Sequence, residues 1–476
     1  MIKVLLISPK RSSEYKVDVM SGFPLGLLYL AGALREAGHK SIILDLDALK
    51  IKNVDIMHLI EKIKPDLIGI TALSFYYPEM RELCRYIENY PIVLGGIHVS
   101  SLPELSLKET KADYLVIGEG EKTIVKLANY IENGGDIAEI KGLAYEKEGK
   151  FIMNEQRERI KNLDEIPFPA WDIFNLERHS SLFKGGYKTF HNYTNYLPIL
   201  TTRGCPFKCT YCASTFFWGP SIRFRSIENI IEEIEYDIKN FKVKHFEIWD
   251  DNFTINRKRV INFCKEIIKK NIDASFYLPN GVRIDTLDRT LIRLMKIAGF
   301  KGLILSPESG SQKILNVVQK KLDLKIVKGV AKMLQKERML TSAYFILGLP
   351  EETAETAYQT IKFGSSLPLN GVAFLIFTPL PGSKLFDEWK KNVNLEEMVW
   401  NTNYMGYQNY EQKTMSSLTL KQLIKFQSLG YIHFILNFKN LFRALRKFNL
   451  HSLKPFILSI RKIYFSLFFN IILRRK

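Results

Sequence analysis

The chain has 476 residues, of which 46% are hydrophobic and 25% are charged. These values are ordinary for globular proteins and exclude collagen-like, fibrous and wholly disordered classes. At roughly 150 residues per domain, the length predicts about three domains. The formal net charge is +18, and most of the excess is C-terminal, because 13 Lys and Arg residues and no acidic residue occur from Gln412 onward.

The cysteines and the chain ends suggest a cellular compartment. The chain has 5 cysteines, an odd number, and Cys205, Cys209 and Cys212 are crowded together. This pattern favours a reducing compartment and a metal site over a secreted disulfide scaffold. The apolar run at the N-terminus has no cleavage site after it, and the nearly uncharged stretch 463–473 is shorter than the ~20 residues that span a bilayer. We therefore expect a cytoplasmic protein.

Residues 1–145 alternate short apolar runs with helical patterns, which predicts parallel strands joined by right-handed crossovers. The helix at 26–37 ends at Gly38, a typical helix-stop residue. We expect a Rossmann-like (flavodoxin-like) open parallel sheet, with ligands outside the carboxyl ends of its strands. The expected strands are 4–8, 41–46, 67–71, 92–95 and 114–117.

A second alternation of strands and helices fills residues 196–394, after a linker at 146–195 that contains proline and glycine but no sustained periodicity. Six strands with crossover helices predict a partial (β/α)6 barrel with its chemistry at the strand carboxyl ends. The expected strands are 197–201, 245–249, 275–278, 302–305, 342–347 and 372–377.

The strongest motif follows the first barrel strand, where Cys205, Cys209 and Cys212 form a C-x3-C-x2-C loop. Three thiolates can ligate three irons of a [4Fe–4S] cluster and leave the fourth iron open for a substrate. A zinc site is the alternative, but no fourth Cys or His follows at finger-like spacing.

This loop resembles the radical S-adenosylmethionine (radical SAM) family. The resemblance implies that SAM chelates the open iron and is cleaved to a 5′-deoxyadenosyl radical by an electron from an external low-potential donor. Further motifs in family order imply SAM contacts at Tyr211, Asp250, Asp251, Arg283 and Glu308. One departure is Ser306-Pro307 before Glu308, where proline fixes φ and removes a donor, so we expect an altered local backbone.

The first domain lacks a G-x-G-x-x-G fingerprint, which disfavours a dinucleotide. Its motifs resemble the cobalamin-binding domain of one radical SAM class, which includes anaerobic magnesium-porphyrin cyclase and C- and P-methyltransferases. The resemblance implies a cobalamin site at Gly26, Ser74, Gly95, Gly96, His98, Gly118 and Glu119. An Asp-x-His-x-x-Gly motif is missing, so we expect base-off cobalamin without a histidine ligand. The alternative is an open sheet that binds no cofactor and only docks on the barrel.

Residues 395–476 form a basic extension with aromatic residues at helical spacing. Such a segment is typical of membrane-surface helices, which would make the protein peripheral at the inner face of the membrane. An equally supported alternative is a helix pair that caps the barrel. Nucleic acid is a less favoured partner, because no RNA-binding module accompanies the charge.

Together, these features predict a cobalamin-dependent radical SAM enzyme that methylates an unactivated carbon of a small-molecule or lipid substrate. One alternative is a cyclase, oxidase or ring-contracting enzyme built from the same domains. Another is a non-enzymatic iron–sulfur protein that associates with membranes.

Overall fold

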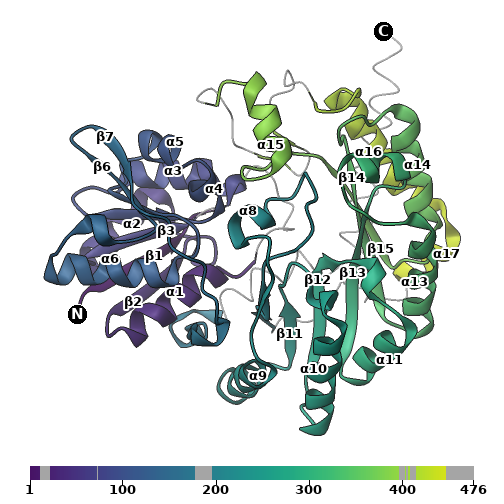
Figure 1. Ribbon diagram of the computed structural model, residues 1–476, viewed down its shortest axis with the longest axis horizontal. Coiled ribbons are helices and arrows are strands. Elements are labelled where there is room, and N and C mark those ends of the chain that lie inside the picture. Colours follow the sequence, from purple (N-terminus) through teal and green to yellow (C-terminus); the bar gives the residue numbers. More distant parts are fainter. Residues whose placement is uncertain are drawn as a thin grey trace.

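The computed structural model describes residues 1–10, 22–71, 73–176, 196–395, 402–403, 406–407 and 414–445. The N-terminal sheet domain and the larger second domain lie side by side, and α4, α8 and α15 lie between them (Figure 1). In each domain, helices pack on the sheet, as expected for a chain in which strands and helices alternate.

The first domain is the predicted open sheet, with strand order β2-β1-β3-β4-β5-β6-β7. Strands β1 to β5 pair in parallel, whereas β6 and β7 pair antiparallel at one edge. The sheet therefore continues beyond the expected boundary at residue 145. The strands are β1 (Lys3–Ser8), β2 (Lys40–Asp45), β3 (Leu67–Thr71), β4 (Ile92–Gly95), β5 (Tyr114–Val116), β6 (Leu143–Lys147) and β7 (Lys150–Met153). The helices are α1 (Leu25–Glu36), α2 (Ile56–Ile63), α3 (Tyr77–Tyr86), α4 (Ile97–Ser101), α5 (Pro103–Glu109) and α6 (Glu121–Asn133).

The second domain contains the six expected strands in one parallel sheet, ordered β15-β14-β13-β12-β11-β8, which does not close into a ring. This arrangement confirms the partial barrel. The strands are β8 (Leu197–Ile199), β11 (His245–Ile248), β12 (Ser275–Val282), β13 (Phe300–Glu308), β14 (Leu340–Leu347) and β15 (Gly371–Ile376). Its helices are α8 (Ser214–Trp218), α9 (Ile227–Phe241), α10 (Arg257–Lys269), α11 (Arg289–Ile297), α12 (Gln312–Val317), α13 (Leu324–Lys336) and α14 (Ala354–Ser366).

Helix α15 (Lys384–Trp389) follows the last barrel strand but packs on the first domain. Phe386 and Trp389 are buried in the same apolar cluster as Leu5, Ile68 and other residues of the first sheet. Burial of two aromatic rings contributes a few kcal/mol of apolar stabilisation. The chain therefore crosses from the barrel back to the first domain and ties the two together.

The expected helical extension over 395–476 is described only in part. Helix α16 (Leu420–Leu436) packs against α14 and β15, and α17 (Phe438–Leu445) follows it. Two short antiparallel pairs complete the described elements: β9 (Thr202–Arg203) with β10 (Arg223–Phe224), and β16 (Thr402–Asn403) with β17 (Gly406–Tyr407). Residues 446–476, which carry much of the predicted basic tail, lie outside the described residues. None of the helices in the described ranges is long and apolar enough to cross a membrane.

Candidate active site

The three motif cysteines lie in the loop between β9 and α8, at the carboxyl edge of the barrel strands. The loop begins at Gly204, whose φ is +100° and whose added Cβ would lie 2.5 Å from the carbonyl oxygen of Ser221, so only glycine fits there. The backbone of Thr210 is held on both sides, because its N–H donates to the Val318 carbonyl (3.1 Å) and its carbonyl accepts from the Leu385 N–H (3.0 Å). The loop is thus fixed by both neighbouring segments.

The three thiols are half-buried and electrostatically coupled. Burial raises the pKa of Cys205, and burial raises the pKa of Cys212 to about 12, with the neighbouring Asp251 and Cys209 adding to both shifts. A thiolate here therefore needs a positive partner, which a metal centre supplies. Among the described residues, no three His, Cys, Asp or Glu side chains gather as ligands of a single ion. Three thiols along one short loop fit the ligand set of an iron–sulfur cluster, in which each thiolate bonds a different iron.

Two of the predicted SAM residues meet at a lysine that the sequence did not single out. Glu308 Oε1 accepts from the Tyr211 hydroxyl (3.1 Å) and from Lys320 Nζ (2.8 Å), and Lys320 Nζ also lies 3.2 Å from the Tyr211 oxygen. The side chains of Lys320 and Glu308 are only 8% and 10% exposed. Burial, followed by the charge of Glu308, raises the pKa of Tyr211 well above its ordinary value. The trio places a buried ion pair and a neutral phenol beside the third cysteine.

The backbone around Glu308 departs from regular strand geometry, as expected from Ser306-Pro307. Glu308 has φ +66°, a left-handed conformation that costs a non-glycine residue about 1–3 kcal/mol and is typical of functional sites. The pairing of β13 with β14 shifts register between Leu305 and Glu308, which is where a proline is tolerated in a sheet. On β12, Gly281 (φ +85°) faces Ser306 so closely that an added Cβ would lie 1.8 Å from its hydroxyl oxygen.

Arg283 holds the backbone of Lys320 in place. It donates to the carbonyl oxygens of Lys320 (2.8 Å) and Lys321 (2.7 Å) and to both carboxylate oxygens of Asp285. Its guanidinium also lies 3.7 Å from the ring centroid of Phe207, inside the cysteine loop. Four of its five N–H donors are used within the protein, so Arg283 positions the backbone of Lys320. Its expected contact with the SAM carboxylate stays a prediction.

The two aspartates after β11 have different surroundings. Asp250 is buried and accepts from the Thr201 N–H (2.6 Å), the Thr201 hydroxyl (2.5 Å) and the Thr202 N–H (3.0 Å). These bonds anchor the segment that leads into the cysteine loop, and the expected contact of Asp250 with SAM stays a prediction. Asp251 accepts from the Ser214 hydroxyl at 2.5 Å, and its charge acts on Cys205 and Cys212, so it remains a residue of the site.

Two glycine positions near the carboxyl edge of the first sheet have open backbone. Nothing lies within 4 Å of a Cβ added to Gly26 or to Gly118, so backbone is open to an approaching ring at both positions. Gly95 ends β4, and Gly96 (φ +105°) turns the chain into α4. Gly118 donates its N–H to Ser100 (2.9 Å). These open, glycine-bearing strand ends fit a cobalamin.

Three side chains predicted to contact cobalamin are buried and make contacts within the protein. His98 is fully buried, lies 3.0 Å from the Ser74 hydroxyl and stacks on Tyr77 at 3.8 Å. Burial lowers the pKa of His98 to about 3, so its ring is neutral. Ser74 is buried with it. Both carboxylate oxygens of Glu119 accept hydrogen bonds inside the protein. The cobalamin contacts of these three side chains stay predictions.

Glu119 belongs to an ion cluster that joins the two domains. Arg203, two residues before Cys205, donates to Glu119 (2.7 Å) and Glu121 (2.5 Å), and Arg223 donates to the other Glu119 oxygen (2.7 Å). Burial alone would lower the pKa of Arg203, but Glu121 and Glu119 raise it. Arg203 also lies over the ring of Trp218 at 4.9 Å. These ion pairs thus hold the start of the cysteine loop against the Gly118 loop of the first domain.

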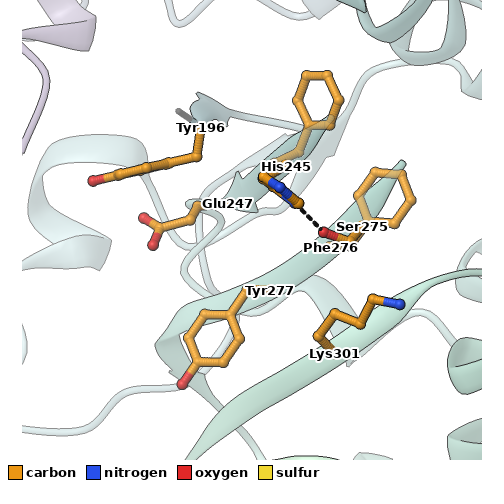
Figure 2. A pocket seen from close by; sticks show the side chains of 8 residues that line it. Tyr196, His245, Glu247, Ser275, Phe276, Tyr277 and Lys301 are labelled. Atoms are coloured by element: carbon orange, nitrogen blue, oxygen red, sulfur yellow. Dashed lines mark hydrogen bonds between the residues drawn. The ribbon is translucent and has the colours of Figure 1, made fainter. Parts of the chain in front are cut away.

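A small pocket lies at the opposite ends of the barrel strands. It is lined by the first residues of β11 and β12, where His245 and Ser275 are joined by a 2.6 Å hydrogen bond, and by Tyr196, Glu247 and Tyr277 (Figure 2). None of the cysteine-loop or glycine positions lines it. The pocket is therefore separate from the candidate active site.

Sequence reasoning missed Lys320 and Arg203 as parts of the site. Arg203 stands in the motif itself, two residues before the first cysteine, and its position is a signal that could have been used. Lys320 follows α12 and precedes α13, in a segment of many lysines, so only its burial distinguishes it. Cys84 and Cys264, the two cysteines outside the loop, are buried in apolar clusters.

Comparisons with known proteins agree with this geometry. The B12 binding domain model matches residues 19–128, and the radical SAM superfamily model matches residues 199–364. Uncharacterized methyltransferase PH0819 of Pyrococcus horikoshii is 31% identical over 471 residues, covering 98% of this chain and 99% of that protein. Anaerobic magnesium-protoporphyrin IX monomethyl ester cyclase of Rubrivivax gelatinosus is 30% identical over 398 residues, covering 81% of this chain and 70% of the cyclase.

A solved structure shares the fold. The radical SAM methyltransferase TsrM of Kitasatospora setae, with its tryptophan substrate and a SAM analogue, superposes with a TM-score of 0.68 at 20% identity, over 82% of this chain and 76% of that one. The two domains imply a [4Fe–4S] cluster, SAM and cobalamin as cofactors. The chain therefore belongs to the radical SAM superfamily, among the members that carry a B12-binding domain, and is a cobalamin-dependent radical SAM enzyme.

Proposed function

We propose that this enzyme methylates an unactivated carbon of a small-molecule substrate. When bound, a reduced [4Fe–4S] cluster would supply the electron that cleaves SAM into methionine and a 5′-deoxyadenosyl radical. That radical would take a hydrogen atom from the substrate carbon to give 5′-deoxyadenosine, and methylcobalamin would supply the methyl group that replaces it. The observation that carries the proposal is the ion cluster at Arg203, which brings the cysteine loop against the Gly118 loop. Such contact lets two cofactors act on one substrate between the domains.

Within this scheme, the trio of Tyr211, Glu308 and Lys320 binds SAM. Lys320 Nζ offers a cation for the SAM carboxylate, while the Glu308 carboxylate accepts from hydroxyl or ammonium groups. Their burial strengthens both interactions, because the local dielectric is low. Arg283 holds the Lys320 backbone in place, so the cation is preorganised and loses little entropy when SAM binds.

Relatives support methyl transfer but also name a second candidate. PH0819, which aligns along nearly its whole length, is named a methyltransferase, whereas the Rubrivivax relative is named a cyclase. Radical cyclisation or oxidation with the same domains is therefore the alternative function. For the cobalamin, buried His98 cannot reach a ligand outside its domain core, which favours the base-off state without a histidine ligand.

The test is anaerobic reconstitution followed by product analysis. We expect about four irons per chain and a change in the cluster EPR signal on addition of SAM. Cys209→Ala should lose both, whereas Cys264→Ala, which removes a buried thiol on α10, should keep both. Hydroxocobalamin should bind the same protein.

The products separate the two functions. With dithionite and substrate, S-adenosylhomocysteine formed beside 5′-deoxyadenosine supports methyl transfer. Formation of 5′-deoxyadenosine alone supports cyclisation or oxidation. A chain that holds its cluster but never cleaves SAM contradicts both.

A further inference from the structure

Helix α17 is attached to the barrel by polar contacts. Asn440 is 1% exposed, and its side-chain amide donates to the carbonyl oxygen of Ser365 at the end of α14 (2.8 Å). Asn437, just before the helix, donates to the same oxygen at 2.9 Å. Figure 1 shows α17 at the outer rim of the barrel, on the side away from the first domain. The side-chain amides of Asn437 and Asn440 therefore attach this segment to the end of α14.

Two aromatic side chains of α17, Phe438 and Phe442, point outward. They are 75% and 65% exposed, and Leu436, the last residue of α16, is 67% exposed. Phe438 and Phe442 are four residues apart, so they lie on the same face of the helix. A helix of a globular protein normally turns such a face to the core. We call these three residues the α17 apolar face, and its exposure indicates a partner.

The sequence next to this face is rich in positive charge. Lys439 is exposed between the two phenylalanines, and eight Lys and Arg residues with no acidic residue follow Leu445. A second copy of the chain would bring two such basic segments together, which like-charge repulsion disfavours. Anionic lipid headgroups attract basic segments, and aromatic side chains insert at the headgroup boundary. The combination of charge and exposed rings therefore matches an anionic membrane surface.

We propose that the α17 apolar face docks this enzyme on an anionic lipid surface, with Phe438 and Phe442 inserted at the headgroup boundary and Lys439 beside the phosphates. The docking is peripheral and reversible. It holds the barrel to the membrane by the rim farthest from the first domain (Figure 1), so the interface between the domains stays free.

The experiment is co-sedimentation of the full chain with vesicles of phosphatidylglycerol and phosphatidylethanolamine in equal parts, or of phosphatidylcholine alone. We expect binding to the anionic vesicles only, weakened by high salt. The double variant Phe438→Ser/Phe442→Ser should partition at least about tenfold less, because two rings no longer leave water. The control is Ile297→Ser on α11, which removes an apolar side chain that is 70% exposed, and it should bind as the wild type does.

Other outcomes would overturn the proposal. Equal binding of the double variant and the wild type would assign the interaction to basic charge alone, and absence of binding to anionic vesicles would refute docking. Self-association that the double substitution abolishes would make a second copy the partner, and the same dependence in a single-stranded RNA titration would make it a nucleic acid. Thermal unfolding of both variants without lipid verifies that the exposed substitutions leave the fold intact.

Discussion

Arg203→Met tests whether the domains are held together by the buried ion cluster. The guanidinium is 4% exposed and contacts Glu119 and Glu121, whose side chains are 4% and 9% exposed. Methionine keeps much of the apolar stem of arginine and removes its charge. Glu119 keeps Arg223 as a partner, whereas the structure shows no second basic partner for Glu121 among the described residues.

The expected loss of folding stability follows from this difference between Glu119 and Glu121. Removing one partner of a buried ion pair destabilises a protein by about 3–5 kcal/mol, and we take the lower end, because Glu119 stays paired. For a unit of 150–250 residues, about 3 kcal/mol lowers Tm by roughly 6 °C or more. The matched control is Arg35→Met, whose bidentate pair with Asp172 also links distant segments but is 49% and 46% exposed. An exposed pair contributes about 0–1 kcal/mol, so its Tm should scarcely move.

Scanning calorimetry at two pH values tests the direction in which the stability deficit of Arg203→Met changes with pH. In Arg203→Met the buried Glu121 carboxylate has lost its cation, and an unpaired buried carboxylate destabilises the folded state in its charged form, which predominates at the higher pH. Stability conferred by such a group is lost as pH rises. The deficit of the variant should therefore be larger at pH 8 than at pH 5, and Glu121→Gln in the Arg203→Met background should restore part of it. A Tm equal to that of the wild type, or a deficit that grows toward acid pH, would refute the reasoning.

Three further substitutions probe other sites. Lys320→Met should weaken SAM binding roughly tenfold or more without loss of iron, since a charge-assisted hydrogen bond contributes about 1.5–3 kcal/mol. The control is Lys321→Met, an exposed neighbour, which should change neither the SAM affinity nor the iron content. EPR titrations with SAM measure the affinity of both variants. Burial raises the pKa of Asp237 on α9 to about 9, so the free energy of unfolding falls as pH rises from about 4 to 9. In urea unfolding, Asp237→Asn should flatten this pH dependence. An unchanged pH dependence would contradict the raised pKa of Asp237. Gly281→Ala should destabilise by about 1–3 kcal/mol, because its Cβ would lie 1.8 Å from a serine hydroxyl oxygen; Gly329→Ala, with open space around it, should be neutral or stabilising in the same thermal scan.

The sequence alone determined the two sheets and the position of the cysteine loop. Strand β3 (Leu67–Thr71) and strand β4 (Ile92–Gly95) coincide with their predicted ranges, because a buried parallel strand is a continuous apolar run with clear punctuation. The hairpin of β6 and β7 was not predicted, since exposed edge strands carry mixed polar residues such as those at 146–150. The C-x3-C-x2-C spacing predicted the donor set, because three closely spaced thiolates suit a [4Fe–4S] cluster with one open iron.

Only the tertiary structure decided which charged residues face the site. Asp250 and Asp251 are adjacent in sequence, yet one anchors the strand end and the other lies near the thiols. Glu119 looked like a ligand residue and is an interdomain ion partner, while Lys320 looked like one surface lysine among many and is buried on Glu308. The physical reason is that charge acts through distance and desolvation. Both depend on segments more than 80 residues apart in the case of Arg203 and Glu119, and no local pattern encodes them.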